Sequence, residues 1–294
     1  MSTHTATAYG PSALGGSLRR FAELTLTLAR TEFKLRYFGS ALGYVWSLVR
    51  PLLFFGVIYV FFTQILNIGK GIPHYGVYLL TGIVLWTYFS EATGACVQCL
   101  VGREALLRKV RFPRMVIPLS VSLTSVFNLG MNFIAVIVFA LVSGINPTLS
   151  WLEMFPIALG FIMLATGVGM LLSALYVRYR DIQPIWEVLS QVLFYCSPIM
   201  YLASSYKQFE HLMLTLNPIA LLLTQMGHAF VHPAPVPTEV GNTGIYVPVQ
   251  HMRSAVQASG GVWHVVVSLS LIPAMFALGW WVFTREAPRV AENL

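Results

Sequence analysis

Three cationic side chains border the first long apolar run of the sequence. Lys34 and Arg36 precede this run, and Arg50 lies near its beginning, next to Pro51. A guanidinium group can donate two parallel hydrogen bonds to phosphate oxygens, whereas the ammonium group of Lys acts as a point charge. Long basic side chains also anchor membrane helices, because they extend to the lipid headgroups. We interpret the three residues as an anchor at headgroup depth, with recognition of a phosphate on a lipid carrier as a further hypothesis.

Glu91 is an acid inside the second apolar run, in the sequence FSEATGACVQC. A carboxylate in a membrane helix is costly unless it faces water or a polar partner. Glu91 is therefore either a pore-facing or gating group, or a contact between helices that nearby Ser or Thr side chains satisfy. Both interpretations stay open. A proton relay would need more ionisable partners than the chain supplies.

Aromatic residues crowd the first apolar run. Helical spacing places Phe55, Tyr59 and Phe62 on one face. Aromatic rings offer flat apolar surfaces over which sugar rings can slide without tight hydrogen bonding, so we predict that these residues and Glu91 line a channel. Aromatic belts at the headgroups, or a plain bundle core, are the alternatives, and the residues alone favour them.

The segment 102–114, GREALLRKVRFPR, has the pattern of a short amphipathic helix between two apolar runs. Leu106, Leu107 and Val110 share one face, and Pro113 would end the helix. The basic residues around this face are Arg103, Arg108, Lys109 and Arg111. Because a small helix of this kind can seat in a groove of a partner protein, we interpret it as a coupling element. An ordinary basic loop would explain the charges, but not the amphipathic face.

The residue types do not predict a catalytic centre, a metal site or a cofactor site. Cys96 and Cys99 form a C-x-x-C pair within an apolar run, and we interpret them as small helix residues. His228 and His232 could share a helical face, but no third metal ligand is in view. The phosphate-binding motif G-x-x-x-x-G-K-[ST] is missing. The chain is therefore not expected to bind and hydrolyse ATP through that motif.

The composition indicates a membrane protein. Charged residues make up 10% of the 294 residues, against about 25% in soluble globular chains. Hydrophobic residues make up 56%, and the mean hydropathy is +0.71. We interpret the net charge of +7 as basic loops and contact with anionic lipid, and not as a nucleic-acid footprint.

Six apolar runs approach the length of about 20 residues that a helix needs to cross a bilayer. They are Tyr44–Leu66, Tyr75–Val97, Met115–Val142, Trp151–Val177, Pro184–Ala203 and Val262–Phe283. If the chain begins in the cytoplasm, fifteen of the eighteen Lys and Arg residues fall on the cytoplasmic side, as the positive-inside rule requires. We therefore predict six spans with both termini in the cytoplasm.

Two further elements flank the predicted spans. An amphipathic stretch before the first span predicts a helix in the membrane interface, with a solvated helix on a soluble partner as the alternative. Its apolar positions are Leu18, Phe21, Leu24, Leu28 and Leu35. The outer gate segment, 204–261, contains two short apolar helices, near Gln208–Leu216 and Pro218–Val231, and the second is predicted to be re-entrant or interfacial.

The predicted organisation has three parts. Residues 1–43 form a cytoplasmic N-terminus with the interfacial helix and no cleavable signal peptide. Residues 44–284 form the six-helix transmembrane domain, and 285–294 form a cytoplasmic tail. The fold class that these elements predict is an all-α integral membrane protein.

Four motifs, in order, resemble one family. Residues 34–55, KLRYFGSALGYVWSLVRPLLFF, resemble the amino-terminal signature of the ABC-2 type permeases. Permeases of this family export bacterial cell-surface polysaccharides. Residues 106–120, LLRKVRFPRMVIPLS, resemble the family's cytoplasmic stretch before the third span. Residues 180–201, RDIQPIWEVLSQVLFYCSPIMY, resemble its fifth span. Residues 216–223, LNPIALLL, resemble the Asn-Pro turn of the family's outer segment. The similarity runs from about residue 17 to 285 and does not fix the substrate.

The resemblance implies a transport subunit in the bacterial cytoplasmic (inner) membrane, with no catalytic activity of its own. In such exporters two copies of the six-span subunit form a channel, and two copies of a separate ATPase, which bind ATP and Mg²⁺, attach from the cytoplasm. The expected cargo is a lipid-linked polysaccharide, such as O-antigen or capsule, or a teichoic-acid-like polymer. A smaller amphiphile, lipid or antibiotic, is the alternative. A membrane-embedded glycan or phosphate enzyme and a gradient-driven carrier are less well supported, because the acids and histidines do not cluster and internal repeats are not visible.

Overall fold

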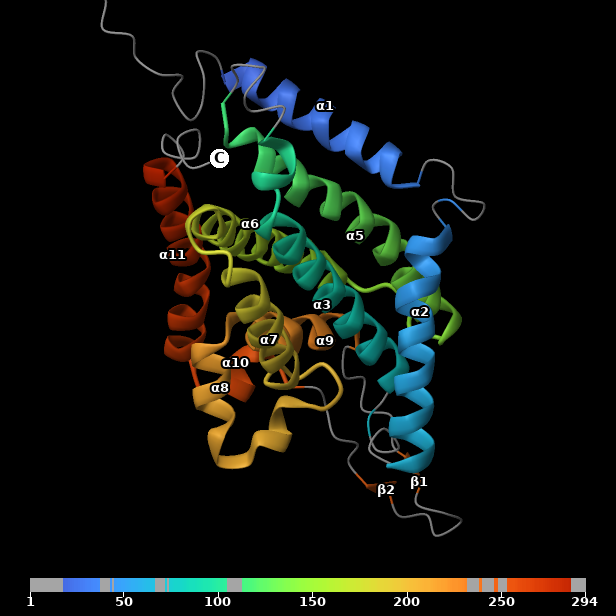
Figure 1. The fold of residues 1–294 in the computed structure, drawn as a ribbon. Coiled ribbons are helices and arrows are strands. Elements are labelled where there is room, and N and C mark those ends of the chain that lie inside the picture. The colour runs from blue at the N-terminus through green and yellow to red at the C-terminus, as the bar shows by residue number, and fades with distance from the viewer. Residues whose placement is uncertain are drawn as a thin grey trace, which may run out of the picture.

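The computed structural model describes residues 18–37, 43, 45–66, 72, 74–104, 113–231, 238–239, 246–247 and 253–286. These residues form a helical bundle with one small hairpin (Figure 1). The helices are α1 (Leu18–Tyr37), α2 (Val45–Val60, continued by a π-helical turn at Phe61–Ile65), α3 (Tyr75–Val97), α5 (Val116–Val142), α6 (Met154–Arg178), α7 (Ile182–Tyr195), α8 (Glu210–Leu216), α9 (Pro218–Phe230), α10 (Ala255–Ser259) and α11 (Val262–Glu286). Short 3₁₀ helices cover Val101–Arg103, Leu149–Glu153 and Ala203–Phe209, and strands β1 (Thr238–Glu239) and β2 (Tyr246–Val247) pair antiparallel.

Four stretches of the described residues are long and apolar enough to cross a membrane. They are Val45–Ile65, Val116–Val142, Leu149–Arg178 and Val262–Glu286. These stretches correspond to the first, third, fourth and sixth predicted spans. The other two predicted spans contain α3 and α7, and neither of these helices is both long enough and apolar enough by the same measure.

The helix α3 lies at the centre of the bundle and contacts α2, α5, α6, α7 and α9. Seventeen of its 23 residues are buried. A helix that is surrounded by other helices presents little surface to lipid, so it can carry Tyr, Thr and Glu residues that a lipid-facing helix would not tolerate. This position explains why α3 is less apolar than α2, α5 and α6.

The helix α7 is shorter than the predicted span Pro184–Ala203, because it ends at Tyr195. Pro198 disfavours helical conformation at the residue before it and offers no N–H. The chain then continues without regular helix, and its carbonyl groups need other donors. Tyrosine hydroxyls supply them: Tyr206 donates to the carbonyl of Cys196 at 2.6 Å, Tyr75 to that of Met200 at 2.7 Å, and Tyr78 to those of Pro198 and Tyr201.

The two short helices predicted in the outer segment are present as α8 and α9. The Asn-Pro turn separates them, and Asn217 caps α9 by accepting hydrogen bonds from the backbone N–H groups of Ile219 and Ala220 at 3.1 and 3.2 Å. The Nδ2 of Asn217 also donates to the hydroxyl of Ser197 at 3.1 Å, which joins the outer segment to the irregular chain after α7. Nine of the 13 residues of α9 are buried.

The packing face of α1 differs from its apolar face. The helix lies on α5, and its buried residues are Thr25 and Ala29. Leu18 and Leu35 are exposed. Small side chains let α1 approach α5 closely, and they leave the leucines on the outer side, where a helix in the membrane interface would contact lipid.

The helices α6 and α11 approach each other closely at two glycines. A Cβ atom added to Gly279 would lie 2.0 Å from the carbonyl oxygen of Gly167, and one added to Gly167 would lie 2.6 Å from the Cα of Phe276. Gly167 and Gly279 therefore allow close packing of α6 against α11, because a larger side chain at either position would meet backbone atoms.

We expect Gly279→Ala to destabilise the protein, because the added methyl group would meet backbone atoms that cannot move aside by a side-chain rotation. Overpacking of this kind typically costs about 1–3 kcal/mol. The matched control is Gly130→Ala in α5, where an added Cβ meets nothing within 4 Å. In helices Ala is favoured over Gly by about 0.5–1 kcal/mol, so the control should be neutral or stabilising. Thermal unfolding of the purified protein in detergent measures both, and equal midpoints would contradict the packing argument.

Candidate functional site

The candidate site is a network of polar residues where α1 meets α3 and α5. Arg36, in the last turn of α1, places Nη1 2.5 Å from Oε1 of Glu91 on α3. Asn128 of α5 also points its Nδ2 at the two carboxylate oxygens of Glu91, at 3.5 and 3.4 Å. The hydroxyl of Tyr37 donates to Oδ1 of Asn128 at 2.7 Å, which fixes the orientation of the amide. Glu91 thus contacts other helices, and its partners are Arg36 and Asn128, not the nearby Ser and Thr residues.

A second ion pair holds α1 one turn earlier. Nη2 of Arg103, just after α3, lies 2.5 Å from Oε1 of Glu32. Thr124 of α5 donates to the backbone carbonyl of Ala29 at 3.3 Å and approaches Glu32 at 3.5 Å. Burial raises the pKa of Glu32, and the Arg103 guanidinium and the Thr124 hydroxyl oppose this rise. The two pairs together fasten α1 along the bundle.

The predicted site residues are therefore only partly brought together. Arg36 and Glu91, which the sequence assigned to different roles, form one pair. Lys34 and Arg50 are exposed, as an anchor at headgroup depth would require. Phosphate recognition by these residues stays a prediction.

Of the predicted coupling residues, only Arg103 lies in the described part of the chain, and it faces Glu32. The remaining ones are outside the described residues. They are Leu106, Leu107, Arg108, Lys109, Val110 and Arg111. Their coupling role stays a prediction.

The three aromatic residues predicted to line a channel have different surroundings within one chain. Phe55 is buried, with its ring centroid 5.5 Å from those of Tyr59 and Phe139. Tyr59 is partly exposed and stacks on Tyr75, and Phe62 is half-buried. Phe55 therefore contributes to the core of the single chain. Whether the three face a channel stays a prediction.

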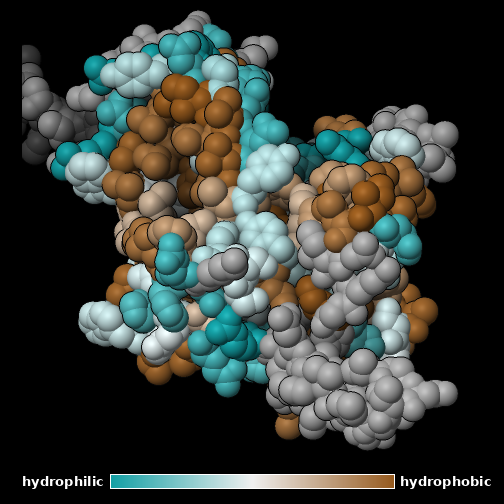
Figure 2. Space-filling model, turned by 90° about the horizontal axis from the view of Figure 1, so that it is seen from below, coloured by the Kyte–Doolittle hydropathy of each residue, from teal (hydrophilic) through white to brown (hydrophobic). Residues whose placement is uncertain are grey.

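The outer surface of α2 and α7 is apolar. Its large exposed side chains include Val57 and Val60 on α2 and Val188 and Val192 on α7. Viewed from the end opposite α1, the molecule has separate hydrophobic areas with polar surface between them (Figure 2). Such areas suit lipid or another membrane helix.

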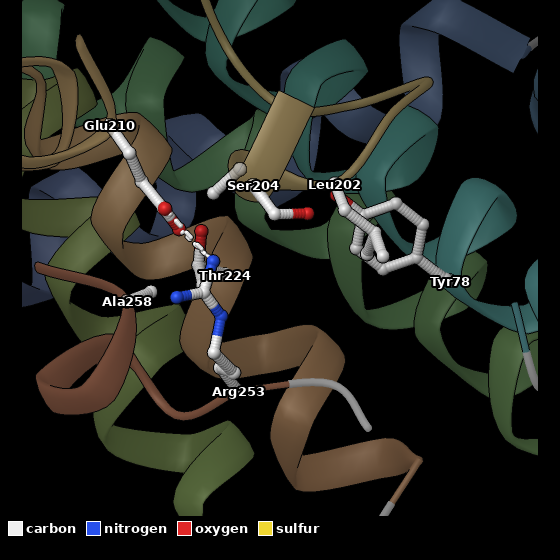
Figure 3. A pocket seen from close by; sticks show the side chains of 8 residues that line it. Tyr78, Leu202, Ser204, Glu210, Thr224, Arg253 and Ala258 are labelled. Atoms are coloured by element: carbon white, nitrogen blue, oxygen red, sulfur yellow. Dashed lines mark hydrogen bonds and ion pairs between the residues drawn. The ribbon is translucent and has the colours of Figure 1, made fainter. Parts of the chain in front are cut away.

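An ion pair and a small pocket in the outer segment were missed by the sequence analysis. Glu210, whose side chain is 8% exposed, accepts two hydrogen bonds from Nη2 of Arg253, at 2.6 and 2.8 Å. The pocket beside them has a volume of about 30 Å³ and is also lined by Tyr78, Ser204 and Thr224 (Figure 3). Space of that size holds about one water molecule, so the pocket does not fit a sugar. The one available signal was that Arg253 is among the few cations of the outer connections.

Comparison with known proteins identifies the family of this chain. The ABC-2 type transporter family matches residues 23–230, which include Arg36, Glu91 and Arg103. The O-antigen export system permease protein RfbA of Klebsiella pneumoniae is 31% identical over 215 residues, which are 71% of this chain and 81% of that relative. The protein of the same name from Myxococcus xanthus is 31% identical over 211 residues, 70% of this chain and 80% of its own length. The chain belongs to the ABC-2 type transporter family of membrane permeases.

Proposed function

We propose that this chain is the membrane subunit of an ATP-driven exporter that moves a lipid-linked polysaccharide, or a teichoic-acid-like polymer, outward across the bacterial cytoplasmic membrane. The observation that carries the proposal is the similarity, over 71% of the chain, to permeases named for O-antigen export. Two copies of the chain would form the channel, and two copies of a separate ATPase would supply the energy.

The geometry supports a transport role better than an enzymatic one. Glu32 and Glu91 are held by Arg103 and Arg36 from other segments, and they join helices to each other. An acid–base centre would instead present a free acid and a base to a common substrate position. In the part of the chain that the structure describes, Glu32 and Glu91 instead join α1 to α3 and to the segment just after it.

The proposal includes six spans with both termini in the cytoplasm. The four long apolar helices account for four spans, and the buried helix α3 and the shorter α7 would be the others. Figure 1 supports the orientation, because α1 and the C-terminal end of α11 lie at one end of the bundle, opposite β1 and β2. Most of the basic residues would then lie on the inner side. Helices α8 and α9 would form a re-entrant outer gate.

Deletion of the gene should leave lipid-linked glycan inside the cell, because synthesis continues while export stops. The measurement is the amount of polyprenyl-linked glycan in the deletion strain, with a strain that carries the gene on a plasmid as control. Purified chain alone should not hydrolyse ATP. Accumulation of a different lipid or of a small amphiphile in place of the glycan would favour the alternative cargo.

We expect Leu107→Asp, and charge reversal of Arg108 together with Lys109, to release or uncouple the ATPase while the membrane fold is kept. Arg103→Glu should act differently, since Arg103 faces Glu32 within the chain. Its defect should be relieved by Glu32→Arg, which restores the pair with the charges exchanged, whereas Glu32→Arg should not relieve Leu107→Asp. Co-purification of the ATPase and its activity in the complex measure both effects. Full coupling in the Leu107 and Arg108/Lys109 variants would argue against the coupling helix.

Arg50 and Arg36 allow a test of phosphate recognition. Losing one charge-assisted hydrogen bond should cost about 1.5–3 kcal/mol, or roughly ten- to a hundred-fold in apparent affinity. If guanidinium geometry matters, Arg50→Lys should impair substrate-stimulated ATPase activity, and Arg50→Gln should impair it more. The same order is expected at Arg36, although substitutions there also break the pair with Glu91. Arg30→Gln, at an exposed position of α1 outside the three predicted residues, is the control for loss of one charge. Wild-type stimulation in the Arg→Lys and Arg→Gln variants would leave anchoring as the role of these residues.

A further inference from the structure

The pair of Arg36 and Glu91 is more accessible than the other ion pair of α1. The side chains of Arg36 and Glu91 are 34% and 35% exposed, whereas those of Arg103 and Glu32 are 24% and 19% exposed. An anion that approaches α1 from outside the bundle can therefore reach the Arg36 guanidinium more easily. Of the two pairs, Arg36–Glu91 is the one that such an anion could open.

The carboxylate of Glu91 is held in place before any ligand arrives. Arg36 binds one of its oxygens, and the Asn128 amide approaches both. Because Tyr37 donates to Oδ1 of Asn128, the amide must turn its NH₂ group toward Glu91. If Arg36 left, the Asn128 amide would remain as a hydrogen-bond donor to Glu91, and Tyr37 would keep that amide oriented. The carboxylate would then not be stranded without donors, which lowers the cost of opening the pair.

The negative charge of Glu91 is not needed if Arg36 only anchors α1 at the lipid headgroups. A basic side chain that only reaches for lipid headgroups requires no carboxylate from the bundle. A neutral Gln at position 91 could keep the contact with Asn128 without placing an acid in an apolar helix. Among the residues that the structure describes, the cation that contacts the charge of Glu91 is Arg36.

Carboxylates and phosphates bind a guanidinium in the same way, through charge-assisted hydrogen bonds to its N–H groups. We infer that Glu91 is a built-in competitor for the phosphate of the lipid-borne substrate: it occupies Arg36 in the empty subunit, and the substrate phosphate displaces it. This inference rests on the proposed export function and adds the group with which the substrate must compete.

Displacement would change the attachment of α1. The last turn of α1 is tied to α3 and α5 through Arg36 and Tyr37, and the preceding turn is tied through Glu32 to Arg103. When a phosphate takes Arg36, the direct tie to α3 is lost while the Glu32–Arg103 tie remains. Arrival of substrate is thereby linked to loss of the contact between the end of α1 and α3, while Tyr37 still holds that end to Asn128 of α5.

The test measures affinity for a phosphate probe in the assembled complex of permease and ATPase, placed in nanodiscs of neutral phosphatidylcholine. The probe is farnesyl phosphate, and farnesol is its counterpart without the phosphate. The readout is the probe concentration that gives half-maximal stimulation of ATPase activity, together with direct binding. The variants are Glu91→Gln, Glu91→Asp, Arg36→Gln and the double variant Glu91→Gln/Arg36→Gln.

Glu91→Gln should tighten binding of farnesyl phosphate roughly twofold to fivefold, because a partly exposed ion pair no longer has to be opened. Glu91→Asp, whose shorter carboxylate reaches Arg36 less well, should give a smaller gain. Arg36→Gln should weaken binding, and adding Glu91→Gln to it should bring no gain. Farnesol should bind all variants alike. The matched control is Glu32→Gln, which neutralises the acid of the other α1 pair and should leave affinity for the probe unchanged.

The possible results separate the inference from the proposed function. Weaker or unchanged probe affinity in both Glu91 variants, with weaker binding in Arg36→Gln, would overturn the competitor role and leave phosphate recognition by Arg36 in place. An equal gain in Glu32→Gln would also overturn it, since the effect would then come from loosening α1 in general. If farnesyl phosphate binds no better than farnesol in any variant, the inference fails, whereas export itself is decided by glycan accumulation in the deletion strain.

Discussion

A polar or charged group inside an apolar bundle has to find its partner within the protein, and much of this structure follows from that requirement. Lipid offers no hydrogen bonds, so an unpaired carboxylate or carbonyl group there is expensive. The acids Glu32, Glu91 and Glu210 each contact an arginine from another segment. The chain after α7 leaves the helical conformation where tyrosine hydroxyls are available to its carbonyl groups. Polar residues therefore determine which segments of the bundle are joined.

The sequence predicted the elements whose signals are local. Long apolar runs located α2, α5, α6 and α11, and the Asn-Pro turn located the boundary between α8 and α9. Both features depend on residues that are close together in the chain. The sequence also identified Arg36 and Glu91 as residues that needed an explanation, because charge is rare in this composition.

The pairing of those residues could not be predicted, since Arg36 and Glu91 are 55 positions apart and the sequence contains no signal for which cation meets which acid. The packing face of α1 was missed for a related reason. Hydrophobic periodicity identifies the apolar face, but Thr25 and Ala29 are buried because their small size allows close approach to α5. The length of α7 was overestimated because apolar residues continue beyond Tyr195, where Pro198 and the surrounding tyrosines end the helix.

The contact between Gly167 and Gly279 has a mechanical consequence. Packed helices usually slide past each other by small changes in the side chains between them. Where two glycines bring backbone against backbone, no such layer exists, and sliding would drive the peptide groups into one another. The helices α6 and α11 therefore act as a single rigid strut. If the bundle opens and closes, these two helices would move as one unit, and relative displacement would occur between helices that pack through larger side chains.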